Sequence, residues 1–350
     1  MKKGYEGLLI GLGIRLNYNM KVGIIGAGYW GINLVRNFYQ LKVLKAVVDV
    51  DTNVLSKVKD AFPGVEVTTD PDVIFDDPEI NGVVIATPAR LHFELSYKAL
   101  RKGKDVMVEK PLALSVREGE QLVAFAGKNN RILMVGHLML YHDGIRRLKD
   151  MIKAGELGNI YYFYSQRVNL GKIRSDEDAL WSFGPHDVSI ALYLFDEVPQ
   201  KVSAVGAAYL QPGIRDVIFM TLYFAGNLMG HIHLSWLDPH KIRRLTIVGS
   251  KKMVVFDDME RFEKLKIYDK GVEVRPPTTY EEGAMAIRVG DIHIPKIDLR
   301  EPLRNECMAF IKAMETREPP VTAGEHGLQV LRVLAAGTES LNHEGAPVTV

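Results

Sequence analysis

The chain has 350 residues, of which 47% are hydrophobic and 25% are charged. This length favours two domains, and the composition is that of a folded protein, which excludes extensive disorder, collagen-like repeats and a membrane bundle. Lysine and arginine number 44 against 43 acidic residues, without a basic stripe, so nucleic acid is not an expected partner. The single cysteine, Cys307, cannot form an internal disulfide, which favours a reducing compartment.

The first 19 residues contain an apolar run, Leu8 to Ile14, that is short and broken by glycines. Arg15 follows it where a secretory signal would have small residues, so we expect an N-terminal extension or a translation start assigned too early. No later segment has the roughly 18 uninterrupted apolar residues that a membrane helix needs. We therefore expect a cytoplasmic protein with no membrane partner.

From Met20 to about residue 140, short apolar runs alternate with helical patterns, one of which runs from Phe93 to Lys102 and ends at Gly103. Such alternation predicts a mostly parallel sheet covered by helices on both faces. The predicted strands are Lys21 to Ile25, Val43 to Val48, Gly82 to Ala86, Val106 to Val108 and Ile132 to Val135.

After about residue 155 the pattern changes to β-rich segments with few helical windows. This predicts a large, mostly antiparallel sheet, one helix from about Pro185 to Phe195 and a final helical region from about Leu303 to Leu341. The β segments are Tyr161 to Val168, Val217 to Phe224, Leu228 to Trp236, Leu245 to Val248 and Met253 to Phe256. We therefore expect an α/β protein with a boundary near residue 140, dividing 20–140 from 141–350.

A glycine-rich turn, Gly26–Gly31, follows the first predicted strand and reads G-x-G-x-x-G. Gly26 permits a tight turn, Gly28 lets the backbone approach a pyrophosphate, and Gly31 allows close helix packing. The helix that follows offers free N–H groups to phosphates, and we expect Tyr29 and Trp30 to contact the cofactor too. The bland alternative is that the glycines only make a turn.

Asp49 ends the second predicted strand, 18 residues after Gly31, where a carboxylate can hold the ribose hydroxyls of an adenine dinucleotide. Val50 follows it, and no arginine lies beside it to offset a 2′-phosphate. NAD is therefore the predicted cofactor rather than NADP. Asp51 is predicted to cap a helix.

Glu109-Lys110-Pro111 follows the predicted strand Val106 to Val108 directly. Ligands of a doubly wound sheet bind outside the carboxyl ends of its strands, so Lys110 is expected at the active crevice. A desolvated lysine loses its proton more readily and can take part in proton transfer. A surface salt bridge between Lys110 and Glu109 is the alternative.

Four segments together resemble the Gfo/Idh/MocA oxidoreductases: Gly26–Gly31, Ala86-Thr87-Pro88, Glu109-Lys110-Pro111 and Gly184-Pro185-His186-Asp187. The resemblance extends from Met20 to the C-terminus. It implies that 20–140 is an NAD-binding Rossmann domain. It also implies that 141–350 binds substrate and forms a homodimer or homotetramer through an open sheet.

In this resemblance Lys110 matches the catalytic lysine, and His186 matches a histidine that acts with it on the substrate hydroxyl. The family often has an aspartate four residues before this histidine, where this chain has Ser182. Serine cannot supply a charge, and Asp187 adjoins His186 but points in another direction on a helix. The pair Lys110 and His186 is therefore the predicted catalytic set, and either could be the base.

The same resemblance implies five cofactor-side features. Glu109 matches an acid near the nicotinamide ribose, with Lys110 beside the cofactor, and Thr87 and Pro88 match a loop along it. His92 opens the next helix beside that loop. The bond between Lys110 and Pro111 is a candidate cis peptide that would fix the direction of the lysine.

Substrate contacts are expected near the strand ends and in the segment that leads to His186. The candidates are Arg167, Asn169, Arg174 and Trp181, with His137 and Tyr141 as weaker ones. Two arginines suit a phosphate or carboxylate, and Trp181 could stack on a sugar or base, although the arginines could equally be solvated. His231 and His233 share one strand face without a third ligand, so we predict no metal.

Three segments look most similar to family members that act on nucleotide-linked sugars: Arg167–Gly171, Leu180–Asp187 and Glu301–Leu303. The predicted reaction is hydride transfer between nicotinamide and a secondary hydroxyl, at the 3-position of a UDP-linked amino sugar or its uronate. Two alternatives remain open. One is a dehydrogenase or reductase of a free polyol, aldose or keto-sugar, and the other is a non-catalytic NAD-binding regulatory protein.

Overall fold

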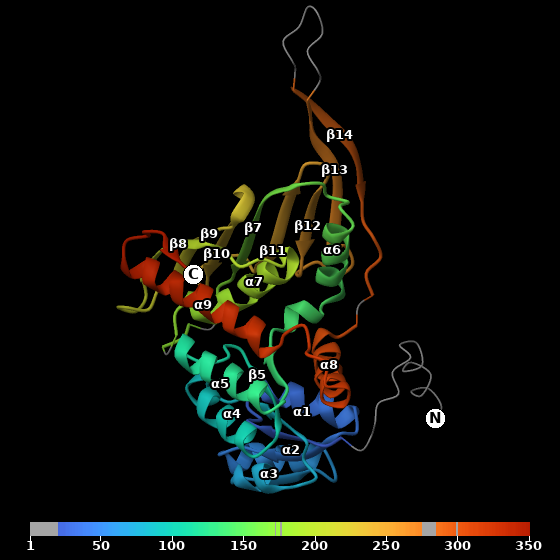
Figure 1. The fold of residues 1–350 in the computed structure, drawn as a ribbon, viewed down its shortest axis with the longest axis vertical. Coiled ribbons are helices and arrows are strands. Elements are labelled where there is room, and N and C mark those ends of the chain that lie inside the picture. The colour runs from blue at the N-terminus through green and yellow to red at the C-terminus, as the bar shows by residue number, and fades with distance from the viewer. Residues whose placement is uncertain (1–19, 172, 176, 275–284, 299) are drawn as a thin grey trace, which may run out of the picture.

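The computed structural model describes residues 20–350 except 172, 176, 275–284 and 299. The predicted N-terminal extension, 1–19, lies outside the described residues. Two sheets divide the molecule, with helices α1 to α5 around the first and the strands of the second above them in Figure 1. The α/β fold predicted from the alternating pattern is confirmed.

The first sheet has six parallel strands in the order β3-β2-β1-β4-β5-β6. Five were predicted to within about one residue, whereas the short β3 has too few residues to show a pattern. Their bounds are β1 Val22–Ile25, β2 Leu44–Val48, β3 Glu66–Thr68, β4 Gly82–Ile85, β5 Asp105–Glu109 and β6 Leu133–Gly136.

Helices cover both faces of this sheet. They are α1 Gly31–Gln40, α2 Thr52–Ala61, α3 Asp72–Asp76, α4 His92–Arg101 and α5 Val116–Lys128. The predicted cap is confirmed, because the Asp51 side chain accepts a hydrogen bond from the Asn53 N–H at 2.8 Å. Strands β1, β4, β5 and β6 are buried along almost their whole length, as a sheet between two helix layers requires, whereas the edge strand β3 is not.

The second sheet has nine strands in the order β14-β13-β12-β11-β7-β10-β9-β8-β15. It is mostly antiparallel as predicted, but β7 and β10 run parallel, so the sheet is mixed. The bounds are β7 Ile160–Val168, β8 Lys201–Ala207, β9 Val217–Tyr223, β10 Met229–Ser235, β11 Ile242–Gly249, β12 Met253–Asp257, β13 Leu265–Val274, β14 Met285–His293 and β15 Val348–Thr349.

Helices α6 (Asp143–Lys153), α7 (Ala179–Phe195) and α9 (Gly324–Asn342) lie on one side of this sheet, and α7 and α9 pack on each other (Figure 1). Tyr162, Phe219 and Met229, on three neighbouring strands, are each about 40% exposed. The second sheet therefore has one covered face and one open face, and His231 stacks on Phe219 on the open one.

Helix α7 starts at Ala179, six residues before the predicted start at Pro185. Asp178 caps it by accepting a hydrogen bond from the Trp181 N–H at 3.2 Å. Proline is a poor interior residue because it lacks an N–H, which is why the sequence suggested a start there. The longer helix places Trp181, Ser182 and His186 on one element.

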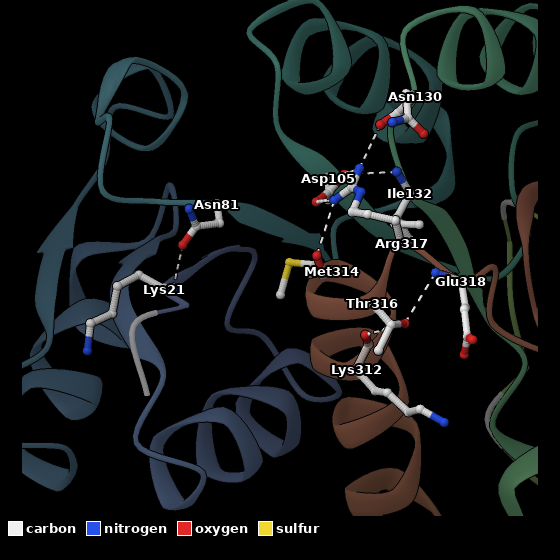
Figure 2. Close-up of polar contacts among 10 residues, drawn as sticks. All are labelled: Lys21, Asn81, Asp105, Asn130, Ile132, Lys312, Met314, Thr316, Arg317 and Glu318. Carbon is white, nitrogen blue, oxygen red and sulfur yellow. Dashed lines mark hydrogen bonds and ion pairs between the residues drawn. The ribbon is translucent and has the colours of Figure 1, made fainter. Parts of the chain in front are cut away.

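The final helical region is two helices, and the first of them, α8 (Pro302–Thr316), returns to the Rossmann sheet. Its apolar side chains, including Phe310 and Met314, join the core formed by β1 and α1. Arg317 ends α8 in a left-handed conformation and donates two hydrogen bonds to Asp105, at 2.6 and 2.9 Å. Figure 2 shows this anchor, in which the Asp105 carboxylate also accepts from the Ile132 N–H.

The predicted boundary near residue 140 stays a prediction. The sheet does change there, but α8 lies on the Rossmann side although its sequence belongs to 141–350. Helix α9 contacts both halves, since it packs on α5 and β6 as well as on α7 and β8. The two halves are thus joined by several packed elements rather than by one linker.

Candidate active site

The glycine-rich turn fits the phosphate-binding role expected of it. Gly26 has φ +97°, and a Cβ there would lie 2.5 Å from the Ala86 oxygen, while a Cβ on Gly31 would lie 2.1 Å from the Gly26 oxygen. These two positions therefore need glycine for the fold itself. A Cβ on Gly28 would meet nothing within 4 Å, so this glycine leaves room for a group outside the protein.

The start of α1 is open to an anion. No side chain caps this helix and its first turn carries no acidic residue, so the N–H groups there can face phosphate oxygens. Tyr29 beside them is 96% exposed, whereas Trp30 is held by its indole N–H, which donates to Glu109 at 2.5 Å. The turn can hold a pyrophosphate, with Trp30 fixed to the floor of the crevice.

Asp49 lies at the end of β2, beside the glycine-rich turn. Its carboxylate accepts hydrogen bonds from the Ala27 N–H at 2.7 Å and from the Asp51 N–H at 3.0 Å. These bonds fix the side chain where the two ribose hydroxyls of an adenosine would approach. A fixed negative charge there opposes a 2′-phosphate, which agrees with the predicted preference for NAD.

Lys110 and Glu109 end β5 at the carboxyl edge of the sheet, and the Lys110–Pro111 peptide is cis, as predicted. The Lys110 ammonium donates to the Ser182 carbonyl oxygen at 3.0 Å, which joins the lysine to α7. Burial lowers the pKa of Lys110, although the charges of Glu177 and Glu109 partly oppose this. The lysine can therefore exchange a proton more readily than an exposed one.

Glu109 is held in a desolvated position. Burial raises the pKa of its carboxyl group, while the Trp30 hydrogen bond and the Lys110 charge act in the opposite direction. A Cβ added to Gly136 on the neighbouring strand would lie 2.9 Å from a Glu109 carboxylate oxygen. Gly136 thus gives this carboxylate the space it occupies.

His92 connects the two cofactor-side loops. Its Nδ1 lies 2.7 Å from the Pro111 carbonyl oxygen and its Nε2 lies 2.9 Å from the Thr87 carbonyl oxygen. Both ring nitrogens therefore contact the main chain, so His92 positions the loops of Thr87 and Lys110. The Thr87 hydroxyl is buried without a protein partner, and Pro88 lines the adjacent pocket.

His186 lies on α7, on the other side of the crevice from Lys110. Its Nδ1 is buried and has no hydrogen-bond partner among the residues that the structure describes. Burial lowers the pKa of His186 well below its usual value, and the charges of Arg167 and Lys110 lower it further. The imidazole is therefore neutral at physiological pH and can accept a proton.

Asp187 does not orient His186. Its carboxylate instead accepts a hydrogen bond from the Arg167 guanidinium at 2.5 Å, and both side chains are more than 90% buried. This pairing also changes the expectation for Arg167, because most of its charge is already neutralised inside the protein. Ser182, in place of the family aspartate, contributes its carbonyl oxygen to Lys110 rather than a side chain.

Of the remaining substrate candidates, Trp181 lines a pocket of about 560 Å³ at the crevice. The lining residues are Pro88, Ala89, Arg90, Pro111, Leu114, Glu177 and Trp181. The Trp181 indole N–H donates to Thr338 at 3.0 Å, which fixes the ring, and Arg174, 42% exposed, pairs with the lining residue Glu177 at 3.0 Å. Asn169 is not among the lining residues, and its side-chain carbonyl oxygen is buried with no hydrogen-bond partner among the described residues.

Two weaker candidates have other surroundings. The Tyr141 ring lies in the core with Phe310, and its hydroxyl contacts Thr322 at 2.9 Å, so Tyr141 lies outside the site. The chain turns into the short helix Leu138–Tyr141 after β6, which carries the ring away from the strand end. His137 does lie near Lys110, but it is only 1% exposed, so a substrate cannot reach it directly.

Three residues near the site were missed by sequence reasoning. His326 on α9 contacts the His137 ring, Arg243 on β11 lies close enough to lower the pKa of His186, and Glu306 on α8 faces Glu109. Each comes from an element far away in the chain. No local pattern could have placed them, because their positions follow from how the helices and sheets pack.

Two sequence families match the chain. Residues 20–137 match the oxidoreductase family with an NAD-binding Rossmann fold, and residues 145–255 match the GFO/IDH/MocA C-terminal domain. Together the matches cover more than half of the sequence, so the protein belongs to the Gfo/Idh/MocA oxidoreductases. The predicted family and its NAD-binding Rossmann domain are confirmed.

Relatives agree with this assignment at low identity. UDP-N-acetylglucosamine 3-dehydrogenase of Acidithiobacillus ferrooxidans is 26% identical over 89% of this chain and 94% of its own. A solved structure described as an oxidoreductase of Magnetospirillum magnetotacticum is 30% identical, with a TM-score of 0.77 over 91% of this chain and 99% of that one.

Other alignments are partial. The chain spans 60% and 58% of two curated relatives, the second being 2,7-anhydro-N-acetylneuraminate hydratase of Mediterraneibacter gnavus, 27% identical over 58% of this chain. In the part of the chain that the structure describes, no helix is long and apolar enough to cross a bilayer. Within the same residues, no group of three His, Cys, Asp or Glu side chains could hold a metal ion.

Proposed function

We propose that this protein is an NAD-dependent dehydrogenase that oxidises a secondary hydroxyl of a sugar. The observation that carries the proposal is the meeting of Lys110, from the Rossmann strand β5, with α7 of the second domain, where His186 lies. A substrate between them would have one proton acceptor on each side. Family membership and the NAD-binding fold support the same reaction.

The protein residues have separable tasks in this proposal. NAD, when bound, takes the hydride from the carbon that carries the hydroxyl. Lys110, whose pKa is lowered by burial and which therefore loses its proton more readily, hydrogen-bonds the reacting oxygen, and Lys110 or His186 accepts its proton. Asp49 holds the adenosine ribose, and Glu109, oriented by Trp30, lies beside the nicotinamide ribose.

For the substrate, we propose a UDP-linked amino sugar or its uronate, oxidised at the 3-position. The relative that acts on UDP-N-acetylglucosamine aligns over most of both chains. The pocket beside Trp181 is roomy enough for part of a nucleotide sugar, and Arg90 on its lining and Arg174 beside it supply positive charge.

A free polyol or aldose is the second candidate, and the Arg167–Asp187 ion pair favours it. Arg167 was expected to bind a diphosphate or carboxylate, but its partner already neutralises it. Arg174 is also paired, with Glu177. A substrate without charge would need neither arginine.

Steady-state kinetics with UDP-N-acetylglucosamine, its uronate, the free sugars and polyols would test this assignment, with NADH formation followed by absorbance. Arg174→Ala should lower kcat/KM for the nucleotide sugar and leave the free sugar unaffected. Arg332→Ala is the matched control, because Arg332 on α9 also pairs with a glutamate, Glu120 of α5, and is similarly exposed. Equal turnover of free and linked sugars would favour the second candidate, and NAD binding without any turnover would favour a regulatory protein.

The cofactor preference needs its own titration. Calorimetry with NAD⁺ and NADP⁺ should show tighter binding of NAD⁺, because the Asp49 carboxylate repels a 2′-phosphate. Equal affinities would contradict the role given to Asp49.

We also propose that the protein assembles as a homodimer or homotetramer through the open sheet face. Tyr162, Phe219 and Met229 form an apolar and aromatic surface there that is larger than isolated exposed side chains would give. Sedimentation at micromolar concentration should show a multiple of the 39.2 kDa chain. A single species at the mass of one chain would contradict this proposal.

A further inference from the structure

Histidines from three elements meet behind the proposed reaction site. His186 comes from α7, His137 follows β6, and His326 comes from α9. The rings of His137 and His326 meet edge to face with centroids 5.6 Å apart. His137 also lies near enough to Lys110 and His186 for their charges to interact.

These rings contain buried nitrogen atoms for which the described part of the chain offers no hydrogen-bond partner. They are both ring nitrogens of His137, Nδ1 of His186 and Nε2 of His326. A buried nitrogen without a hydrogen bond destabilises the folded state, so a fold keeps such atoms where they have another use. His137 is 1% exposed and cannot touch a substrate, whereas His326 is part-buried and so is the more exposed ring of the pair.

Both rings of the His137–His326 pair are neutral. Burial lowers the pKa of His137 well below its usual value, and burial lowers that of His326 to about 4. A neutral imidazole has one nitrogen that accepts a proton and another that releases one. The titratable groups with which His137 interacts are Lys110 from β5, His186 from α7 and His326 from α9.

We propose that His137 and His326 form an outlet that carries the substrate proton from Lys110 or His186 to solvent. The inference rests on the proposed function, because each oxidation of a hydroxyl releases one proton. The hydroxyl O–H bond breaks, the C=O bond forms as the hydride leaves, and the proton passes to Lys110 or His186. His137 then accepts a proton at one nitrogen and releases its other one to His326, directly or through one water molecule, and His326 releases a proton to bulk water.

The kinetic test compares His326→Phe, which keeps an aromatic edge against His137, with wild type. His343→Phe is the matched control, because it lies at the far end of α9 and its Nδ1 contacts only the Glu339 carbonyl oxygen. In weak buffer, His326→Phe should release protons, followed with a pH indicator, about 10- to 100-fold more slowly, the upper figure being the lower limit for one positioned proton-transfer group. Imidazole in solution should restore the rate, and the KM of the substrate should not change.

A second measurement needs no substrate and so separates this inference from the proposed function. In protein labelled with ¹⁵N-histidine, NMR would follow exchange of the His137 ring N–H with water, assigned through His137→Gln. Exchange should be fast in wild type and in His343→Phe, and at least tenfold slower in His326→Phe. Unchanged exchange in His326→Phe would overturn the proposed outlet. So would a loss of activity in His326→Phe that imidazole does not rescue and that comes with a higher KM. If wild type turned over no sugar, only the proposed function would be overturned.

Discussion

Strand β5 carries a carboxylate at each end, and the two differ in how fully the protein supplies them with hydrogen-bond donors. Asp105 at its start accepts two hydrogen bonds from Arg317 and one from the Ile132 N–H, as Figure 2 shows. Glu109 at its end has the Trp30 indole and its own neighbour's N–H, and burial raises its pKa. The protein therefore supplies more hydrogen bonds to the carboxylate at the start of β5 than to the carboxylate at its end.

The same contrast extends across the sheet. At the carboxyl edge, the Thr87 hydroxyl and both ring nitrogens of His137 have no hydrogen-bond partner among the described residues, and neither does Nδ1 of His186 on α7. At the opposite edge, Arg317 also donates to the Asn130 carbonyl oxygen at 2.6 Å. Polar groups with hydrogen-bond partners in the protein fix the packing of α8 at one edge of the sheet. Polar groups without such partners are available to a cofactor, a substrate or a proton at the other edge. One edge thus serves stability and the other serves function.

Removing the Lys110 amine from the carboxyl edge of the first sheet should have the largest effect on the rate of turnover. Lys110→Ala should lower kcat by about 10²–10⁴-fold, because it removes the group that binds the reacting oxygen. NAD affinity, measured by calorimetry, should stay within a few-fold of wild type. A loss below tenfold on the true substrate would show that another residue has this task.

Breaking the buried ion pair between Arg167 on β7 and Asp187 on α7 should have the largest effect on stability. Arg167→Ala leaves the Asp187 carboxylate buried without its partner, which should lower the free energy of unfolding by about 3–5 kcal/mol. Urea denaturation would measure this change. A loss below about 1 kcal/mol would mean that Arg167 is free to bind a substrate anion after all.

At the opposite edge of the first sheet, Arg317→Ala should lower the free energy of unfolding by about 2–3 kcal/mol. This loss is smaller than that expected for Arg167→Ala, because Arg317 is one-third exposed. The kcat per folded molecule should not change, since the anchor lies at the opposite end of β5 from Lys110. Denaturation and kinetics on the same sample would compare the two. A fall in kcat without a loss of stability would contradict the view that this edge of the sheet serves stability alone.

The last effect depends on pH and concerns Glu306, whose carboxylate oxygens are buried with no hydrogen-bond partner among the described residues. Burial raises its pKa well above the usual value, so the folded protein holds a proton that the unfolded chain loses above about pH 4.3. The stability that this group contributes is full below that pH and is lost as pH rises toward the folded pKa, by at most about 1.4 kcal/mol per pH unit. Glu306→Gln should therefore gain in Tm over wild type between pH 5 and pH 8, and a constant difference would contradict a protonated Glu306.

Features encoded locally could be predicted from the sequence. The glycine-rich turn, the cap at Asp51 and the position of Lys110 after a strand each depend on a few adjacent residues and on the period of the apolar pattern. Two further predictions came from the family resemblance: the cis bond before Pro111, and the joint action of Lys110 and His186. The structure brings these two residues to one crevice.

Features that depend on long-range packing could not be predicted. Arg167 looked free because its partner, Asp187, lies 20 residues later on another element. Tyr141 looked like a strand-end residue, but the turn after β6 buries it. In both cases a contact that no local pattern encodes decided the outcome. The start of α7 is different, because its cap is local: the Asp178 carboxylate accepts from the N–H of Trp181 three residues later, whereas we predicted the start at Pro185.

The return of α8 to the Rossmann sheet has a consequence for how the protein is made. Phe310 and Met314 fill the space over Gly82, where an added Cβ would lie 2.4 Å from the Met314 sulfur. A ribosome synthesises the chain from its N-terminus, so the strands of the first sheet emerge long before the helix that covers them. The nascent chain must therefore keep one apolar face of its first domain uncovered until residues 302–316 have emerged, and during that interval this face is a natural substrate for a chaperone.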